Sequence, residues 1–193
     1  MARAASRPAN RAGDRRLGAA RVEQWRWCVH DTWLGPLLAC AGERGLVHVG
    51  LAVEEPEALL SKLARRGARQ VRCLESRAHL ARALLQLDEY FAGRRAVLDH
   101  PLDCIGSPFE LRVWEIERGI PRGATRTYGE LARELGASGA ARAVGGATGR
   151  NPLLLFVPCH RVLSSNGLGG FSAPGGAATK ARLLSFEGAW PAN

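Results

Sequence analysis

The chain has 193 residues, of which 46% are hydrophobic and 23% charged, so it can bury the cores of one large or two small domains and is too apolar for global disorder. Its apolar runs are short. The run at residues 153–157 is far below the roughly 18 to 20 residues that a membrane helix needs, so we expect no membrane contact. The five cysteines form no CxxC pair, which argues against a disulfide framework or zinc knuckle and favours reduced thiols in the cytoplasm.

The formal net charge of +9 is unevenly distributed, with +5 in residues 1–21, −2 in residues 22–117 and +6 in residues 118–193. Concentrated positive charge is typical of proteins that bind a polyanion, most often nucleic acid. A basic surface that contacts only solvent explains the charge equally well at this point.

Residues 1–21 consist mainly of Ala, Arg, Gly and Pro. They have too few large apolar side chains to offset the entropy of ordering, which predicts a disordered basic arm. An organelle transit peptide is the alternative, but Asp14 and Pro8 interrupt an amphipathic helix.

Residues 22–105 are predicted to form a small α/β domain. The apolar, β-branched run at residues 46–53 predicts a strand. A helix is expected to begin at Pro56, and leucines spaced by four and three residues predict another helix at residues 78–91. Nothing in this region indicates catalysis.

Residues 106–193 are predicted to form a second, mostly helical domain. Pro108 opens a helix, and Thr127 with Glu130 has the spacing of a capping box at the start of a short helix. A glycine-containing turn then leads to a helix at residues 140–147. Two short helices joined by such a turn are typical of a helix-turn-helix, although a helix pair in an all-α core has the same pattern.

The helix at residues 140–147 has small side chains apart from Val144 and Arg142. A helix this bare can enter a DNA groove closely and insert one arginine. The alternative is a small-residue packing face that leaves Arg142 in solvent.

Cys159 follows an apolar run and precedes His160 and Arg161. A nearby base or cation stabilises a thiolate, and these two neighbours could supply both, with a water between Cys159 and His160. An inert, buried structural cysteine remains the alternative.

These residues belong to a longer pattern. The segment Pro158-Cys159-His160-Arg161-Val162, with Asn151-Pro152 before it and Gly169-Gly170-Phe171-Ser172 after it, resembles the active-site signature of the O6-alkylguanine-DNA alkyltransferases, also called methylated-DNA–protein-cysteine methyltransferases. Similar motifs occur in the family's order at residues 106–109, 127–132, 142–145 and 183–188. The resemblance covers residues 106–188.

The resemblance implies an α+β fold, with a small RNase H-like α/β domain followed by a winged helix-turn-helix-like catalytic domain. It also implies direct-reversal DNA repair, in which the alkyl group of O6-methylguanine in double-stranded DNA moves to Cys159 in a single turnover. O4-methylthymine stays open as a second substrate. No cofactor, metal or obligatory protein partner is implied, and we expect a monomer.

The family's catalytic roles fall on three residues of this chain. Cys159 is the nucleophile, His160 activates it through water, and Glu187 orients the histidine. Asn151 matches a structural asparagine that links the helix-turn-helix to the cysteine segment.

The resemblance also implies DNA contacts that flip the damaged nucleotide out of the duplex. Arg142 fills the gap in the base stack, Tyr128 helps to rotate the nucleotide, and Ala143 and Gly145 belong to the helix that enters the minor groove.

The guanine pocket is implied to use the backbone of Cys159 and Val162, with Ser172 near O6 and Phe171 as a wall. Many relatives have tyrosine where this chain has Phe171, which keeps the apolar wall but loses a hydroxyl. The zinc sites of some relatives do not transfer, and the basic arm has no counterpart.

Three rival functions remain. A sensor could bind alkylated DNA without repairing it, but such relatives lack the cysteine. A cysteine hydrolase would use Cys159 and His160 and would turn over repeatedly. A transcription factor needs more side chains on its recognition helix than residues 140–147 offer.

Overall fold

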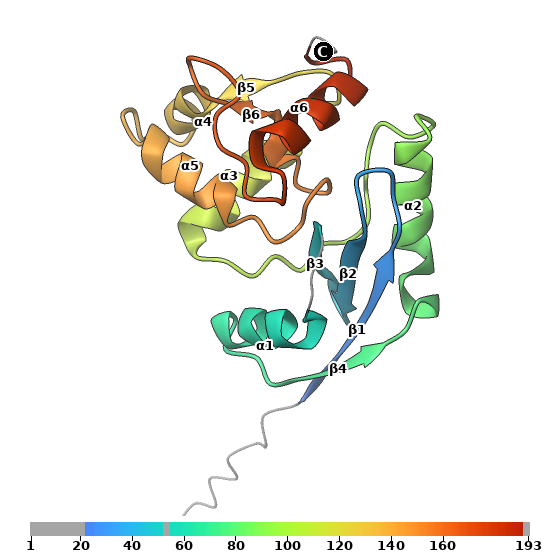
Figure 1. The fold of residues 1–193 in the computed structure, drawn as a ribbon. Coiled ribbons are helices and arrows are strands. Elements are labelled where there is room, and N and C mark those ends of the chain that lie inside the picture. Colours follow the sequence, from blue (N-terminus) through green and yellow to red (C-terminus); the bar gives the residue numbers. More distant parts are fainter. Residues whose placement is uncertain (1–21, 52–54, 191–193) are drawn as a thin grey trace, which may run out of the picture.

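The computed structural model describes residues 22–51 and 55–190. The predicted basic arm and the end of the strand predicted at residues 46–53 lie outside these ranges. The architecture is α+β, with a four-stranded mixed sheet and its helices followed by a helical domain (Figure 1).

The first domain has its strands in the order β3-β2-β1-β4. Strand β1 (Glu23–His30) pairs antiparallel with β2 (Leu37–Gly42) and parallel with β4 (Val71–Glu75), and β2 pairs antiparallel with β3 (Gly45–Leu51). Every residue of β2 is buried, because helices cover both faces of the sheet.

Two amphipathic helices provide that cover (Figure 1). Helix α1 (Pro56–Arg66) packs its leucines against Trp25 on one face. The short 3-10 helix η1 (Ala78–Leu80) leads into α2 (Ala81–Phe91), which packs on the other face. The two predicted helices are confirmed, and α1 does begin at Pro56.

The second domain begins with α3 (Pro108–Arg118), which Ser107 and Glu110 cap in a capping box. A short strand β5 (Arg126–Thr127) precedes α4 (Tyr128–Glu134), whose predicted capping box is present. Helix α5 (Ala141–Gly149) follows a turn in which Gly136 and Gly139 have positive φ values of 68° and 93°, a conformation that glycine adopts without strain.

The remaining elements carry the cysteine segment. They are the 3-10 helix η2 (Cys159–Arg161), strand β6 (Val162–Leu163), which pairs parallel with β5, and helix α6 (Gly176–Phe186). Trp114 ties α3 to α5, since its indole nitrogen donates to the Ala147 carbonyl at 3.0 Å.

The two domains share one continuous core. The backbone of Val49 at the sheet edge exchanges hydrogen bonds of 2.9 and 2.8 Å with Pro152 and Leu154. The segment that leads to Cys159 therefore lies alongside β3 and is joined to it by a single parallel β-bridge between Leu153 and Val49. Among the described residues, no helix has the length and apolar character needed to cross a bilayer.

Candidate active site and DNA-binding surface

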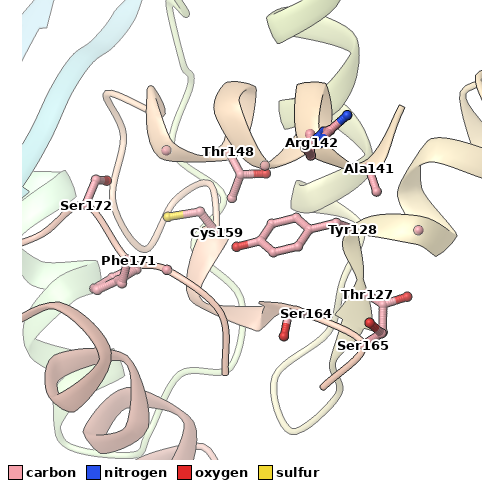
Figure 2. Close-up of a pocket in the computed structure, with 14 residues that line it drawn as sticks. Thr127, Tyr128, Ala141, Arg142, Thr148, Cys159, Ser164, Ser165, Phe171 and Ser172 are labelled. Atoms are coloured by element: carbon pink, nitrogen blue, oxygen red, sulfur yellow. The ribbon is translucent and has the colours of Figure 1, made fainter. Parts of the chain in front are cut away.

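A pocket of about 570 Å³ lies beside α4, α5 and the loop at residues 164–172. Figure 2 shows the Cys159 sulfur directed toward the Ser172 side of the pocket and the Tyr128 hydroxyl directed toward Cys159. The predicted site residues that line it are Tyr128, Arg142, Gly145, Cys159, Phe171 and Ser172. The structure thus gathers residues from four separate segments around one thiol.

The other predicted residues do not line the pocket; they are Ala143, Asn151, His160, Val162 and Glu187. Val162 is fully buried behind it, and its carbonyl oxygen accepts a 2.6 Å hydrogen bond from Lys180. Ala143 is exposed on α5, and Arg142 also points out of the pocket toward solvent (Figure 2). The outer face of α5 is therefore available to a partner.

Asn151 holds the turn that delivers the cysteine. Its side-chain nitrogen donates to the Val157 carbonyl at 2.8 Å, and its oxygen accepts from the Leu153 backbone at 2.9 Å. Within this turn Leu155 has a φ of 72°, a conformation that costs a non-glycine residue on the order of 1 kcal/mol and that clusters at functional sites.

His160, which follows Cys159 in the chain, and Glu187 form a buried pair. The His160 Nε2 atom lies 3.1 Å from the Glu187 Oε1 atom, and both side chains are inaccessible to solvent. Burial lowers the pKa of His160 despite the opposing effect of Glu187, so the imidazole is neutral at rest. Within the described ranges neither ring nitrogen of His160 makes a hydrogen bond of good geometry, although Nε2 lies within ion-pair distance of Glu187. A neutral ring with Nε2 protonated toward Glu187 can accept a proton at Nδ1.

Glu187 is ionised although it is buried. Burial favours its neutral form, but the hydrogen bonds and charges of His160 and Arg161 outweigh burial and hold the pKa of the carboxyl well below its usual range. Arg161 donates to both carboxylate oxygens, from Nε at 2.8 Å and from Nη2 at 2.6 Å.

The predicted role of Arg161 as a cation beside the thiol is therefore wrong. Its guanidinium faces Glu187 and the Ile120 carbonyl. Burial, reinforced by the charge of Glu117, raises the pKa of Cys159 to about 12, so the resting thiol is protonated. Lys180 is the cation that favours the thiolate.

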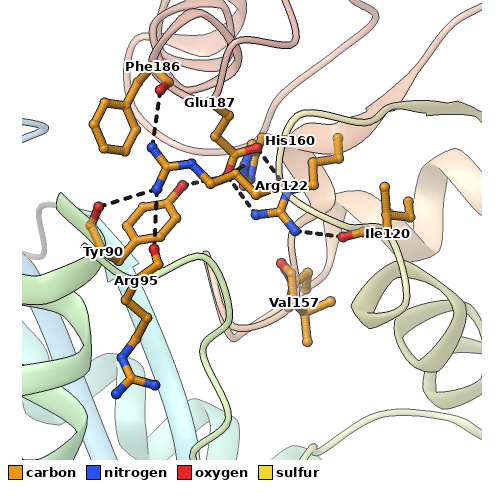
Figure 3. Close-up of polar contacts among 10 residues, drawn as sticks. Tyr90, Arg95, Ile120, Arg122, Val157, His160, Phe186 and Glu187 are labelled. Carbon is orange, nitrogen blue, oxygen red and sulfur yellow. Dashed lines mark hydrogen bonds and ion pairs between the residues drawn. The ribbon is translucent and has the colours of Figure 1, made fainter. Parts of the chain in front are cut away.

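Sequence reasoning missed a contact between the two domains that supports this pair. Tyr90 of α2 donates a 2.6 Å hydrogen bond to Glu187 Oε1. Arg122 lies next to it, with hydrogen bonds of 3.2 Å to the carbonyls of Arg95 and Phe186 and with its guanidinium 4.5 Å from the Phe186 ring centroid (Figure 3). No sequence motif marks these residues.

Lys180 was also missed. It is fully buried, and its Nζ donates to three carbonyls, those of Val162, Leu168 and Gly170, at 2.6, 2.6 and 3.2 Å. Burial lowers its pKa to about 8. The lysine therefore fixes the loop that forms one wall of the pocket.

For residues 22–51 and 55–190, the structure has no cluster of three or more His, Cys, Asp or Glu side chains that could hold a metal ion. All five cysteines, which lie within these ranges, are free thiols.

Family models match both parts of the chain. Residues 26–104 match the ribonuclease-like domain of 6-O-methylguanine DNA methyltransferase, and residues 108–189 match its DNA-binding domain.

Individual relatives agree with these models. A methylated-DNA–protein-cysteine methyltransferase of Mycolicibacterium paratuberculosis is 50% identical over 108 residues, which is 55% of this chain and 64% of that protein. The Methanosarcina acetivorans protein of the same name is 35% identical over 168 residues, covering 84% of this chain and 97% of the relative.

Solved structures are similar over both domains. The O6-methylguanine methyltransferase of Mycobacterium tuberculosis has a TM-score of 0.70 at 35% identity, covering 88% of this chain and 96% of that one. A structure of the M. tuberculosis protein in complex with DNA has a TM-score of 0.67 at 37% identity, covering 88% of this chain and 96% of that one.

Proposed function

This chain belongs to the methylated-DNA–protein-cysteine methyltransferase family, and we propose that it repairs alkylated guanine in double-stranded DNA by moving the alkyl group from O6 to Cys159. The observation that supports this most strongly is the position of Cys159 in the wall of a pocket of about 570 Å³, which is large enough for a purine, with the neutral His160 next to it in the chain and paired with the ionised Glu187.

The proposed reaction begins with a proton transfer. The Cys159 thiol gives its proton to His160 Nδ1 through a bridging water, and Glu187 stabilises the imidazolium that forms. The sulfur then attacks the alkyl carbon. The sulfur–carbon bond forms, the bond from that carbon to O6 breaks, and guanine leaves with the electron pair and takes up the proton that His160 had accepted, relayed through water. A thioether is a poor leaving group, so each molecule acts once.

Tyr90 and Arg161 assist without touching the substrate. Their three hydrogen bonds to Glu187 fix the carboxylate and keep it ionised while His160 becomes positively charged. These two residues are positioning residues, and Cys159 and His160 are the groups that react.

We propose that α5 binds the DNA. Its exposed Arg142 lies at the mouth of the pocket, and the exposed Ala143 follows it in the helix, in a part of the chain with a net charge of +6. A stacked base cannot reach Cys159, so the nucleotide must flip out of the duplex, with Arg142 taking its place. Affinity should then come mostly from phosphate contacts and should fall steeply with added salt.

Within the pocket, Tyr128, Phe171 and Ser172 would surround the flipped base. Gly169, with a φ of 72°, lets the backbone approach the Tyr128 ring, since a Cβ there would lie 3.3 Å from the hydroxyl oxygen. Val162 would contribute its backbone only. We further propose that the protein acts in the cytoplasm as a monomer, without cofactor or protein partner.

The decisive experiment is a transfer assay with a duplex that carries O6-methylguanine labelled with tritium in its methyl group. We expect one labelled methyl group per protein molecule, on Cys159. A sensor that only binds the lesion would give no transfer, and a hydrolase would release product repeatedly, so either outcome rejects the proposal. Cys159→Ala should abolish transfer but retain binding.

A further inference from the structure

The second domain has a buried carboxyl group that the proposed mechanism does not use. Glu117 of α3 is fully buried. Its Oε1 atom lies 2.6 Å from the hydroxyl of Thr148, a residue in the pocket wall, and its Oε2 atom has no hydrogen-bond partner within the described ranges.

Other buried acids of this chain are neutralised by arginine. Glu187 has Arg161, and Glu110 has both Arg66 and Arg150. Glu117 has no such partner among the described residues. The nearby Lys180 attracts Glu117 through its charge but does not hydrogen-bond it, because an ammonium group has three N–H donors and all three point to carbonyl oxygens.

A carboxylate in this position would be buried with one hydrogen bond and no hydrogen-bonded counter-ion, which is more costly than a neutral acid. A protonated Glu117 can instead donate to Thr148, whose own hydroxyl hydrogen then points to the Val144 carbonyl at 2.9 Å. Burial accordingly raises the pKa of Glu117 to about 7, with Thr148 and Lys180 opposing the shift.

The ionisable groups that interact electrostatically with Glu117 come from α4, η2 and α6, whereas α5 contributes only the Thr148 hydroxyl. They are Tyr128 of α4, Cys159 of η2 and Lys180 of α6. A negative charge on Glu117 raises the pKa of Cys159, and only burial has a larger effect on that thiol. The thiol and the carboxyl therefore compete for ionisation in the same buried space.

We propose that Glu117 is a positioning residue for alkyl transfer, which must keep its proton so that Cys159 can release its own to His160. This inference rests on the proposed function, because the thiolate it controls is the proposed nucleophile. At alkaline pH, where Glu117 is ionised, its negative charge would lower the fraction of Cys159 that is thiolate and would therefore limit the reactivity of the sulfur.

The test compares Glu117→Gln, which keeps the shape without the charge, with Glu115→Gln, which removes an exposed carboxylate from the same helix. Iodoacetamide labels the thiol without DNA, and mass spectrometry measures modification of Cys159 from pH 5.5 to 9.5. Methyl transfer from DNA is measured over the same range.

The rate ratio of Glu117→Gln to wild type should be close to one at pH 6, where Glu117 is neutral in the wild type. Above pH 7 we expect it to rise to about threefold. Lowering the pKa of Cys159 by one unit raises its thiolate population about tenfold. A less basic thiolate is also a weaker nucleophile, which reduces the gain in rate. A ratio that does not change with pH, or an equal change in Glu115→Gln, overturns the proposal.

Wild-type protein provides a second test that needs no folded variant. If Glu117 and Cys159 compete for ionisation, the rate of Cys159 labelling should change with pH in two steps. A rate profile that fits a single ionisation refutes the proposal. If thiol labelling behaves as expected but no methyl group is transferred from DNA, the proposed function fails while the competition stands.

Discussion

The hydrogen bond from Tyr90 to Glu187 allows a sharp test of how the first domain supports the site. Tyr90→Phe removes one oxygen atom and leaves the ring, whose edge contacts with Phe91 and Phe186 remain. The lost hydrogen bond is 2.6 Å long, buried and made to an ionised group. Hydrogen bonds to charged groups contribute about 1.5 to 3 kcal/mol, so the free energy of unfolding should fall by about 2 kcal/mol.

The melting temperature reports this loss. For a chain of 150 to 250 residues, 1 kcal/mol corresponds to a shift of about 2 to 4 °C, which predicts a decrease of about 4 to 8 °C. The pKa of folded Glu187 lies well below its usual range, so its contribution is present above the unfolded pKa and is lost only as the pH falls through the folded value. The deficit should therefore be constant between pH 8 and pH 6.

Tyr128→Phe is the matched control, because it removes the same atom from the other tyrosine of the chain, whose hydroxyl makes no hydrogen bond to the described residues. Its melting temperature should change by less than about 2 °C, as expected for a substitution within 0.5 kcal/mol. Equal shifts in the two variants would refute the reasoning that Tyr90 anchors Glu187.

Three further predictions concern the pocket. Arg142→Ala should slow transfer from duplex DNA by about tenfold or more but leave transfer from the free base O6-methylguanine unchanged, and equal losses in the two assays would reject its role in flipping. Lys180→Met leaves three carbonyls without a donor, so urea denaturation should show a loss of about 3 kcal/mol, and retained stability would contradict its anchoring role. Asn151→Ala removes two hydrogen bonds and should cost about 2 kcal/mol, with slower iodoacetamide labelling of Cys159, whereas unchanged labelling would show that the turn does not position the thiol.

Local signals in the sequence predicted local structure well. The capping box at Thr127 and Glu130, the proline at the start of α1 and the leucine spacing of α2 all act within one or two helical turns, and all three are present. The β2 strand was missed for a physical reason. Its LLACAG sequence is buried on both faces, so the alternation of apolar and polar residues that marks a half-buried strand is absent.

The error about Arg161 shows why adjacency in sequence is a poor guide to contact. Cys159, His160 and Arg161 form a 3-10 turn, in which successive side chains point about 120° apart. Only one of the three can face the pocket, and the structure gives that place to Cys159. The arginine is instead directed to Glu187, 26 residues away.

The first domain contributes to the site although its sequence has no catalytic motif. Tyr90 and Glu187 are 97 residues apart in the chain, a separation that no local pattern can report. Val49 fixes the other end of the arrangement through its backbone bonds to Pro152 and Leu154, which lead to the cysteine. The sheet edge thus holds the segment that leads to Cys159, the proposed nucleophile, while α2 contacts Glu187, the carboxylate proposed to orient His160. Because burial opposes ionisation of both Cys159 and Glu187, we expect their chemistry to depend on these fixed partners, and hence the proposed reactivity of the second domain to require the first.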